Sequence, residues 1–288
     1  MEHINLKARA KINLTLDVTG VRDDGYHELK MIMQTVELYD RVYIKKIEKP
    51  YVKLKSNLEW LPTDGKNLAY RAAEIIRKEY GINEGVFIEL QKAIPVAAGL
   101  AGGSSDCAAV LYGMNILFGL KIDRKRMAEI ALELGSDVPY CLMRGTALAE
   151  GRGEILTKLP PCPESWVVLA KPPVGLSTAA VYKALDKAEV TVHPDTEAAI
   201  RAIENNDLSG VADNLSNVLE KVSIEMCPMV GQLKKCFIDN GAIGALMSGS
   251  GPTVYGLFDD KDLAAEAAET IRKEFQLRDV ILTKIYNV

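Results

Sequence analysis

The first half of the chain has two patterns of apolar and polar positions, one typical of strands and one of helices. Three stretches alternate between apolar and polar side chains or are rich in β-branched ones and are expected to be strands, at residues 4–18, 32–47 and 86–91. Three others repeat apolar side chains at helical spacing, at residues 67–80, 104–118 and 124–134. The Pro-Pro-Cys-Pro segment at 160–163 then interrupts both patterns.

The second half begins a new series of elements after this segment. Strands are expected at residues 166–171, 243–247, 253–258 and 279–286. Helices are expected near residues 177–186, 195–204, 226–239 and 261–275. In the last helix, apolar side chains recur at steps of four, which predicts that one face is formed by Leu263, Ala267, Ile271 and Phe275.

Strands and helices mix without a strict strand-helix-strand alternation, so the pattern favours an α+β fold over a doubly wound parallel sheet. A chain of 288 residues is long enough for two cores. The proline-rich segment therefore predicts an N-terminal domain over residues 1–160 and a C-terminal domain over residues 161–288.

Composition narrows the classes of function. The chain carries 35 basic and 39 acidic residues, a net charge of −4, so it has no overall field that would attract nucleic acid or an anionic membrane. No signal-peptide pattern opens the chain and no apolar run reaches the length of a membrane span, which predicts a cytoplasmic protein. Five cysteines without a Cys-x-x-Cys pair, beside only three histidines, argue against a disulfide framework and a zinc site and predict buried thiols.

The stretch PVAAGLAGGSSDCAAVL, residues 95–111, has the composition of an anion-binding loop. Gly99, Gly102 and Gly103 allow the backbone to curl so that successive N–H groups point inward, and Ser104 and Ser105 add hydroxyl donors. The helical pattern that follows, at Cys107, Leu111, Met114 and Phe118, places the loop at a helix N-terminus, where phosphates bind readily. The alternative is that Ser104 or Ser105 only caps the helix, with Asp106 in its first turn.

The loop lacks the lysine of an ordinary phosphate-binding loop, so a cation must come from elsewhere in the chain. In ARAKINLTLDV, the period of a strand places Lys11 and Asn13 on one face. There they suit an anionic or hydroxylated ligand. The alternative is that this face is simply the solvent-exposed side of the strand. In ELGSDVPYCL, Asp137 lies at a break after Gly135, which is a common place for a catalytic carboxylate and equally for an N-cap.

These motifs resemble a known family. ARAKINLTLDVTGVRDDGYHEL, PVAAGLAGGSSDCAAVL and GALMSGSGPTVYGLF together are similar to the three motifs of the superfamily that contains galactokinase, homoserine kinase, mevalonate kinase and phosphomevalonate kinase. The central loop is shared across this superfamily. The KIN segment followed by DGYHEL resembles the branch that acts on 4-diphosphocytidyl-2-C-methyl-D-erythritol, and the similarity extends over essentially the full chain.

The resemblance implies a two-domain fold, with the phosphate loop in the N-terminal domain, a ferredoxin-like C-terminal domain and an active site in the cleft between them. It also implies a reaction in the non-mevalonate isoprenoid pathway, in which the γ-phosphoryl group of ATP is transferred, with Mg²⁺, to the 2-hydroxyl of 4-diphosphocytidyl-2-C-methyl-D-erythritol. No nucleic-acid or membrane partner is expected. Phosphoryl transfer requires in-line placement and charge stabilisation, which suits these residue types.

The resemblance further implies roles for single residues. Lys11 matches the family's active-site lysine and Asp137 its catalytic aspartate, which accepts or orients the proton of the substrate hydroxyl. The residues that match its ATP-binding positions are Pro95, Gly99, Gly102, Gly103, Ser104, Ser105 and Asn67. The expected substrate-binding residues are Asn13, Tyr26, His27 and Tyr182.

Alternatives to several of these roles follow from local sequence. His27, in the turn opened by Asp23, Asp24 and Gly25, is assigned to hydrogen bonding with cytosine, with Tyr26 and Tyr182 stacking on the ring, whereas a histidine in a turn is usually only solvated. Tyr182 also fits simple packing on an amphipathic helix. Asn67 also fits a helix cap, and the turn 249–251 also fits a connection between two strands.

Two other functions stay open from sequence alone. The chain would phosphorylate another small alcohol, such as homoserine or mevalonate, if Tyr26 and His27 did not read cytosine. It would be an ATP-binding regulator if it had lost catalysis, although the presence of both Lys11 and Asp137 argues against this. The sequence does not identify the ligands of magnesium.

Overall fold

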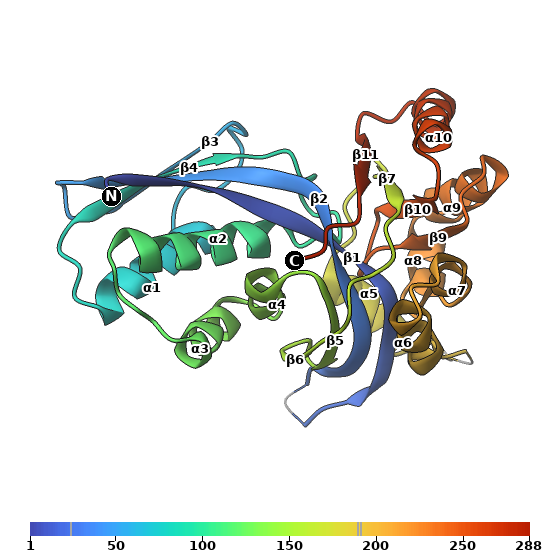
Figure 1. Cartoon of the computed structure of the whole chain (residues 1–288), viewed down its shortest axis with the longest axis horizontal. Coiled ribbons are helices and arrows are strands. Elements are labelled where there is room, and N and C mark those ends of the chain that lie inside the picture. The colour runs from blue at the N-terminus through green and yellow to red at the C-terminus, as the bar shows by residue number, and fades with distance from the viewer. Residues whose placement is uncertain (24, 189, 191) are drawn as a thin grey trace. The chain divides into compact units, whose positions relative to one another are not determined.

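The computed structural model describes residues 1–23, 25–188, 190 and 192–288 (Figure 1). Its strands are β1 His3–Val21, β2 His27–Ile47, β3 Val52–Ser56, β4 Gly85–Gln91, β5 Thr146–Gly151, β6 Ile155–Lys158, β7 Trp166–Ala170, β8 Ser216–Asn217, β9 Gly244–Met247, β10 Val254–Phe258 and β11 Val280–Lys284. Its helices are α1 Leu68–Glu79, α2 Gly102–Leu117, α3 Arg124–Leu134, α4 Val138–Met143, α5 Thr178–Leu185, α6 Thr196–Glu204, α7 Leu208–Asp213, α8 Glu220–Met226, α9 Met229–Asp239 and α10 Lys261–Glu274.

The chain forms two compact units, each assembled from separate stretches of sequence. The first unit consists of Met1–Ala10, Leu38–Val96 and Ala101–Met143, and the second of Lys11–Glu37, Ala97–Leu100 and Arg144–Val288. The long strands β1 and β2 contribute one half to each unit. The predicted domain boundary at residue 160 stays a prediction.

The first unit is a layer of helices on a sheet. Strand β3 pairs in parallel with β4, and β4 pairs antiparallel with β2. Helices α1 and α2 pack against each other and cover one face of these strands (Figure 1). The alternation of strand side chains explains this arrangement, since Val52 and Leu54 are buried while Lys53 and Lys55 are exposed. The buried side of α2 includes Cys107, Leu111 and Met114, as the helical spacing predicted.

The second unit contains a four-stranded antiparallel sheet in the order β11-β7-β10-β9. Along the chain its members follow as strand, helices, two strands, helix and strand, which is the ferredoxin-like arrangement predicted for the C-terminal part. Helices α9 and α10 pack on this sheet, with Phe237 and Ile271 fully buried. The α+β fold predicted from the mixed pattern is confirmed.

Several elements differ from the prediction. The helix expected near 226–239 is α9, which begins only at Met229, after Pro228, and the preceding helix α8 was not predicted. On α10 the buried side chains are Ala264, Ala267, Ala268 and Ile271, whereas Leu263 is exposed. Steps of four advance by more than one helical turn, so a row at this spacing winds off the buried face.

Short elements escaped the periodicity because they offer too few residues to establish a pattern. These are β3, the hairpin of β5 and β6, helices α4 and α7, and the two-residue strand β8.

All five cysteines are buried free thiols, as predicted. Burial raises the pKa of Cys162 to about 12 and raises that of Cys107 as well, so both stay protonated at neutral pH.

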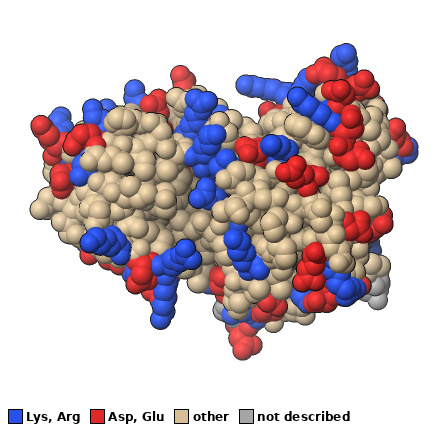
Figure 2. Space-filling model, in the orientation of Figure 1, with Lys and Arg blue, Asp and Glu red and all other residues tan. Residues whose placement is uncertain are grey.

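None of the described helices has the length and apolar character needed to cross a membrane. On the visible face, basic and acidic side chains are both widely distributed, in keeping with the nearly balanced charge of the sequence (Figure 2).

Gly113 in α2 provides a test of packing in the first unit. A β-carbon there would lie 2.5 Å from Ile44 Cδ1 and 2.8 Å from Leu6 Cδ1. We expect Gly113→Ala to destabilise the protein by about 1–2 kcal/mol, because an overpacking cost of about 1–3 kcal/mol exceeds a gain of up to about 1 kcal/mol in helix propensity. Thermal unfolding measures the effect. Gly231→Ala in α9 is the control, since its β-carbon would only touch Ile224, at 3.5 Å. A higher unfolding temperature for Gly113→Ala would contradict the packing.

Candidate functional site

The N-terminus of α2, in the first unit, has peptide N–H groups that no side chain caps. Its N-cap residue is Ala101, in the left-handed conformation with φ of 54°, and it makes no side-chain capping bond. The first amide to bond back is that of Ser105, which donates to the Ala101 carbonyl at 2.8 Å. Capping by Ser104 or Ser105, the alternative raised by the sequence, is therefore wrong. The amides of Gly102, Gly103 and Ser104 are the orphan donors of a helix N-terminus, which suit an anion.

The two serines differ in what their side chains do. Ser105 is buried, and its hydroxyl donates to the Arg9 carbonyl at 2.6 Å, so it ties α2 to β1. Ser104, which is half-buried, lies in the first turn beside the exposed Gly103. Asp106 lies in the second turn rather than the first, and it is paired with Lys92. Of the hydroxyl groups predicted to donate to an anion, that of Ser105 thus donates to the protein backbone instead.

The glycines of the loop also differ in their roles, which the composition of the loop alone did not reveal. Gly103 belongs to the helix, has no positive φ, and a β-carbon on it would meet nothing within 4 Å. The expectation that Gly103 supplies a curled backbone is therefore wrong. Because Gly103 has no side chain, the space beside it is open. A β-carbon at Gly102 would instead lie 3.0 Å from Ile94 Cγ2 and 3.4 Å from Lys92 Nζ. Pro95, which follows Ile94, is half-buried at the start of the loop.

In the second unit, Gly99 packs against the turn that follows β9. Gly99 has a φ of 74°, and a β-carbon there would lie 2.2 Å from the carbonyl oxygen of Ser248. The Ser248 hydroxyl donates to the Gly99 carbonyl at 3.0 Å. Only glycine fits this position. Ala97, two residues earlier, also has a positive φ, of 52°.

The turn 249–251 connects β9 and β10 and lies next to Lys11. Gly251 N–H donates to the Ser248 carbonyl, and Ser248 N–H donates to that of Thr253, both at 2.9 Å. A β-carbon on Gly249 would lie 3.5 Å from Lys11 Nζ. The turn is therefore a connection, as the sequence suggested, and it also shapes the surroundings of Lys11.

Lys11 and Asn13, also in the second unit, form a buried pair on β1. Lys11 Nζ donates to Asn13 Oδ1 at 2.8 Å, and the two residues are 5% and 0% exposed. Asn13 Nδ2 lies 3.3 Å from the sulfur of Met31. The two side chains share one face of the strand, as the period of two predicted, but that face is buried rather than solvent-exposed. Asn13 orients the lysine side chain.

Asp137 lies in the first unit between α3, which ends before Gly135, and α4. It is half-buried, and its carbonyl accepts the Cys141 amide at 3.0 Å, so its backbone is at the N-cap position of α4. Helix α4 packs against α2. The bond that begins α4 uses the carbonyl of Asp137, and the catalytic role of its carboxylate stays a prediction.

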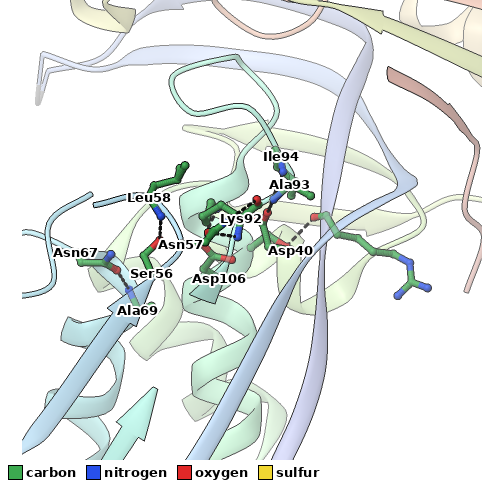
Figure 3. A network of polar contacts seen from close by, with 12 residues as sticks. Asp40, Ser56, Asn57, Leu58, Asn67, Ala69, Lys92, Ala93, Ile94 and Asp106 are labelled. Atoms are coloured by element: carbon green, nitrogen blue, oxygen red, sulfur yellow. Dashed lines mark hydrogen bonds and ion pairs between the residues drawn. The ribbon is translucent and has the colours of Figure 1, made fainter. Parts of the chain in front are cut away.

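Asn67 caps α1. Its Oδ1 accepts the Ala69 amide at 2.9 Å (Figure 3). Its Nδ2 donates to the Pro62 carbonyl at 2.8 Å, which fixes the preceding loop. The structure thus gives Asn67 the capping role that the sequence offered as an alternative. Its expected place near the adenine of ATP stays a prediction.

His27 and Tyr182, from β2 and α5, meet in the second unit. Their ring centroids are 4.6 Å apart, and His27 Nε2 lies 2.7 Å from Asp186 Oδ1. Because a carboxylate only accepts, Nε2 carries the hydrogen, and in a neutral ring Nδ1 is an acceptor. Tyr182 is half-buried, whereas Val181 and Leu185 form the buried face of α5. Sequence reasoning missed Asp186, which is 159 residues from its partner.

Tyr26, half of whose surface is exposed, lies under the Arg152 guanidinium, at 4.9 Å from the ring centroid. This contact holds one face of the ring by a cation–π interaction. Arg152 comes from the turn between β5 and β6, and no pattern along the chain indicated this contact. Asp24, which the sequence placed in the turn before Tyr26, lies outside the described residues.

The contrast between Gly99 and Gly103 gives a test of the loop's conformation. We expect Gly99→Ala to lower the unfolding temperature, because its β-carbon would overlap the Ser248 carbonyl and its φ is strained for alanine. Gly103→Ala, inside the helix and facing open space, is expected to keep or raise it. Thermal unfolding of both variants beside the wild type measures this. Equal stability of the two variants would contradict the described backbone.

The GHMP kinases N terminal domain family matches residues 67–145, and the GHMP kinases C terminal family matches residues 199–277. The chain is 48% identical to a 4-diphosphocytidyl-2-C-methyl-D-erythritol kinase of Lachnospira eligens, over 99% of both chains. It is 49% identical to the kinase of that name from Caldicellulosiruptor saccharolyticus, over 96% of this chain and 95% of the other. A crystal structure of 4-(cytidine 5'-diphospho)-2C-methyl-D-erythritol kinase superposes with a TM-score of 0.84 at 31% identity, covering 99% of this chain and 100% of that one. The chain therefore belongs to the 4-diphosphocytidyl-2-C-methyl-D-erythritol kinases, a family of small-molecule kinases within the GHMP kinases.

Proposed function

We propose that this protein transfers the γ-phosphoryl group of ATP to the 2-hydroxyl of 4-diphosphocytidyl-2-C-methyl-D-erythritol, a step in the non-mevalonate route to isoprenoid precursors. The observation that carries the proposal is the N-terminus of α2, whose first amides are left uncapped after a left-handed Ala101. A phosphate is the ligand that such a helix end favours.

ATP is bound by the loop from Pro95 to Ser105. The amides of Gly102, Gly103 and Ser104 receive phosphate oxygens, and the space at Gly103 admits them. Gly99 allows the close approach of the loop to Ser248, and Ser105 anchors the first turn through the Arg9 carbonyl. Asn67 fixes the loop before α1, on the side proposed for the adenine ring.

Mg²⁺ accompanies ATP in this proposal. Among the described residues, no group of three or more His, Cys, Asp or Glu side chains is arranged to hold a metal ion. Magnesium is commonly held by substrate phosphates, water and only one or two carboxylates. The bound ion would neutralise negative charge on the phosphates.

Lys11 supplies the positive charge that the loop itself lacks. Its ammonium group is buried and has an oriented position, because Asn13 Oδ1 accepts one of its hydrogens. A cation held in a fixed place stabilises charge that spreads over the transferred phosphoryl group at no cost of reorganisation. Asn13 acts on the substrate through this lysine, and its own direct contact with substrate stays a prediction.

Asp137 handles the proton of the substrate. Its carboxylate accepts the proton of the 2-hydroxyl, the oxygen forms a bond to the γ-phosphorus, and the bond from that phosphorus to the β-γ bridging oxygen breaks to release ADP. The position at the start of α4, a helix packed on α2, gives this carboxylate a firm backbone support.

The cytosine ring is read by His27, Tyr26 and Tyr182. With Nε2–H held by Asp186, the Nδ1 atom of His27 accepts a hydrogen from the exocyclic amine of cytosine. Tyr182 lies against His27, and Tyr26 offers an exposed ring, so both provide aromatic surface for a base. The cytoplasmic location stays a prediction.

A substrate panel tests the proposed activity. Purified protein is incubated with ATP, Mg²⁺ and one acceptor at a time: the cytidyl substrate, homoserine or mevalonate. We expect phosphorylation of the cytidyl substrate with release of ADP. Faster turnover of homoserine or mevalonate would assign the protein to another alcohol, and ATP binding without transfer to any of them would make it a regulator.

Asp137→Asn is expected to lower kcat by about 10²–10⁴-fold, which is the usual effect of losing a general base. ATP affinity is expected to persist, because the loop amides do not depend on this carboxylate. Steady-state kinetics and calorimetry measure the two quantities. Asp123→Asn is the control, because Asp123 caps α3 by accepting the Arg126 amide and has no proposed contact with substrate. A kcat above a tenth of the wild-type value would remove Asp137 from the mechanism.

His27→Ala is expected to weaken binding of the cytidyl substrate about tenfold to a hundredfold, because an unpaired base edge costs roughly 1–3 kcal/mol. ATP affinity should not change. Asp186→Ala should act in the same direction but less strongly, because the imidazole remains and only loses its orientation. His193→Ala is the control, since His193 also pairs with an aspartate, Asp17, at 2.7 Å. Equal losses for both ligands would show that His27 does not read the base.

A further inference from the structure

A buried ion triad lies beside the phosphate loop in the first unit. Lys92 Nζ donates to Asp40 Oδ2 and, at 2.6 Å, to Asp106 Oδ2 (Figure 3). The side chains of Lys92, Asp40 and Asp106 are 3%, 0% and 3% exposed. One ammonium group between two carboxylates leaves the triad with a formal charge of −1 when both carboxylates are ionised.

The triad joins three segments that are distant in sequence. Asp40 comes from β2, Lys92 follows β4, and Asp106 belongs to the second turn of α2. The other oxygen of Asp40, Oδ1, accepts the amides of Ala93 and Ile94 at 2.6 and 2.8 Å. These amides immediately precede Pro95, so Asp40 fixes the backbone where the loop begins.

A second side chain holds the same backbone from the other side. Asn57 Oδ1 accepts the Lys92 amide at 2.8 Å, and Asn57 Nδ2 donates to the Lys92 carbonyl at 3.1 Å (Figure 3). The backbone of Lys92 is thus fixed as well as its side chain. Through Nζ, this fixed residue then holds Asp106 and with it the first turns of α2.

The two ends of the loop therefore lie next to each other, at the triad. A β-carbon on Gly102 would lie 3.0 Å from Ile94 Cγ2 and 3.4 Å from Lys92 Nζ, so the residue before the loop and the first residue of α2 are in contact. The loop between them has no regular structure to maintain its shape. The distance between its two ends is set by this contact and by the triad.

The triad is poorly suited to a purely stabilising role. Removing three charges from water is costly, and well-packed apolar residues often replace buried ion pairs without loss of stability. One oxygen of Asp106, Oδ1, is buried and has no hydrogen-bond partner among the described residues. Burial, together with the charge of Asp40, raises the pKa of Asp106 to about 7 in spite of Lys92. Conversely, the two carboxylates raise the pKa of Lys92, although its burial acts to lower it.

We propose that Lys92, Asp40 and Asp106 are positioning residues for ATP: they hold the two ends of the phosphate loop together, so that the amides at the start of α2 point at the phosphates before ATP arrives. This inference rests on the proposed function, because it assigns the loop to ATP. It predicts that the triad affects ATP affinity more than it affects the stability of the fold.

The test replaces all three charges by side chains of similar size, in the variant Asp40→Asn, Lys92→Met, Asp106→Asn. The amide oxygen introduced by Asp40→Asn can still accept the N–H groups of Ala93 and Ile94, so the fold is kept while the ionic link to α2 is lost. We expect the dissociation constant for ATP, measured by calorimetry, to rise at least about tenfold, and that for the cytidyl substrate to change less than about twofold. The unfolding temperature should stay within a few degrees of the wild type.

Hydrogen exchange gives a readout without ATP. In the free variant, the hydrogen-bonded amides of Ile94 and Ser105 should exchange faster than in the wild type, while those of α10 should not change. Should the triple variant fail to fold, Asp106→Asn alone is measured in the same way, and a smaller loss of ATP affinity with faster exchange at Ser105 is expected. The control is Glu79→Gln, which breaks the ion pair of Glu79 with Arg126 between α1 and α3.

Unchanged ATP affinity and unchanged exchange in a folded triad variant would overturn the positioning role. Equal losses for ATP and the cytidyl substrate, with a large fall in unfolding temperature, would reduce the triad to a structural ion cluster. A wild-type protein that does not bind ATP would refute the proposed function instead, and the exchange measurement would still decide whether the triad holds the loop.

Discussion

The uncapped N-terminus of α2 is the constraint on which the site depends. A helix that begins without a capping side chain leaves its first amides unpaired, at a cost in stability unless a ligand or water satisfies them. Here Ala101 takes a left-handed conformation where Ser, Thr, Asp or Asn would cap, and the Ser105 hydroxyl bonds to Arg9 instead. The anion-binding site proposed here would need no net positive charge on the protein, whose net charge is −4.

In the proposed mechanism, the positive charge for the phosphates comes from outside the loop. Lysine in an ordinary phosphate loop sits next to the amides in sequence, whereas here Lys11 comes from β1 and is oriented by Asn13. Lys92, which does lie next to the loop, directs its charge to Asp40 and Asp106 and so is unsuited to neutralise a phosphate. In the proposed mechanism the two lysines have different tasks: Lys11 stabilises charge on the phosphates, and Lys92 holds the backbone of the loop.

Local patterns predicted the long elements, whereas contacts between distant residues carry no signal in a single sequence. Helices α1 and α2 and strand β1 were found because apolar spacing is repeated often enough to be read, and the break before Asp137 followed from the glycine there. The ferredoxin-like part and the kinase family came from the resemblance rather than from periodicity. In contrast, Asp186 reaches His27 from 159 residues away and Asp40 reaches Lys92 from 52, so neither pair could be predicted.

The central claim is that the amides at the start of α2 hold the phosphates of ATP. It is tested most directly by a crystal structure of the protein with Mg²⁺ and a non-hydrolysable ATP analogue. We expect oxygens of the β- and γ-phosphates to lie within hydrogen-bond distance of the amides of Gly102, Gly103 and Ser104. Phosphates bound elsewhere, with water on these three amides, would contradict it.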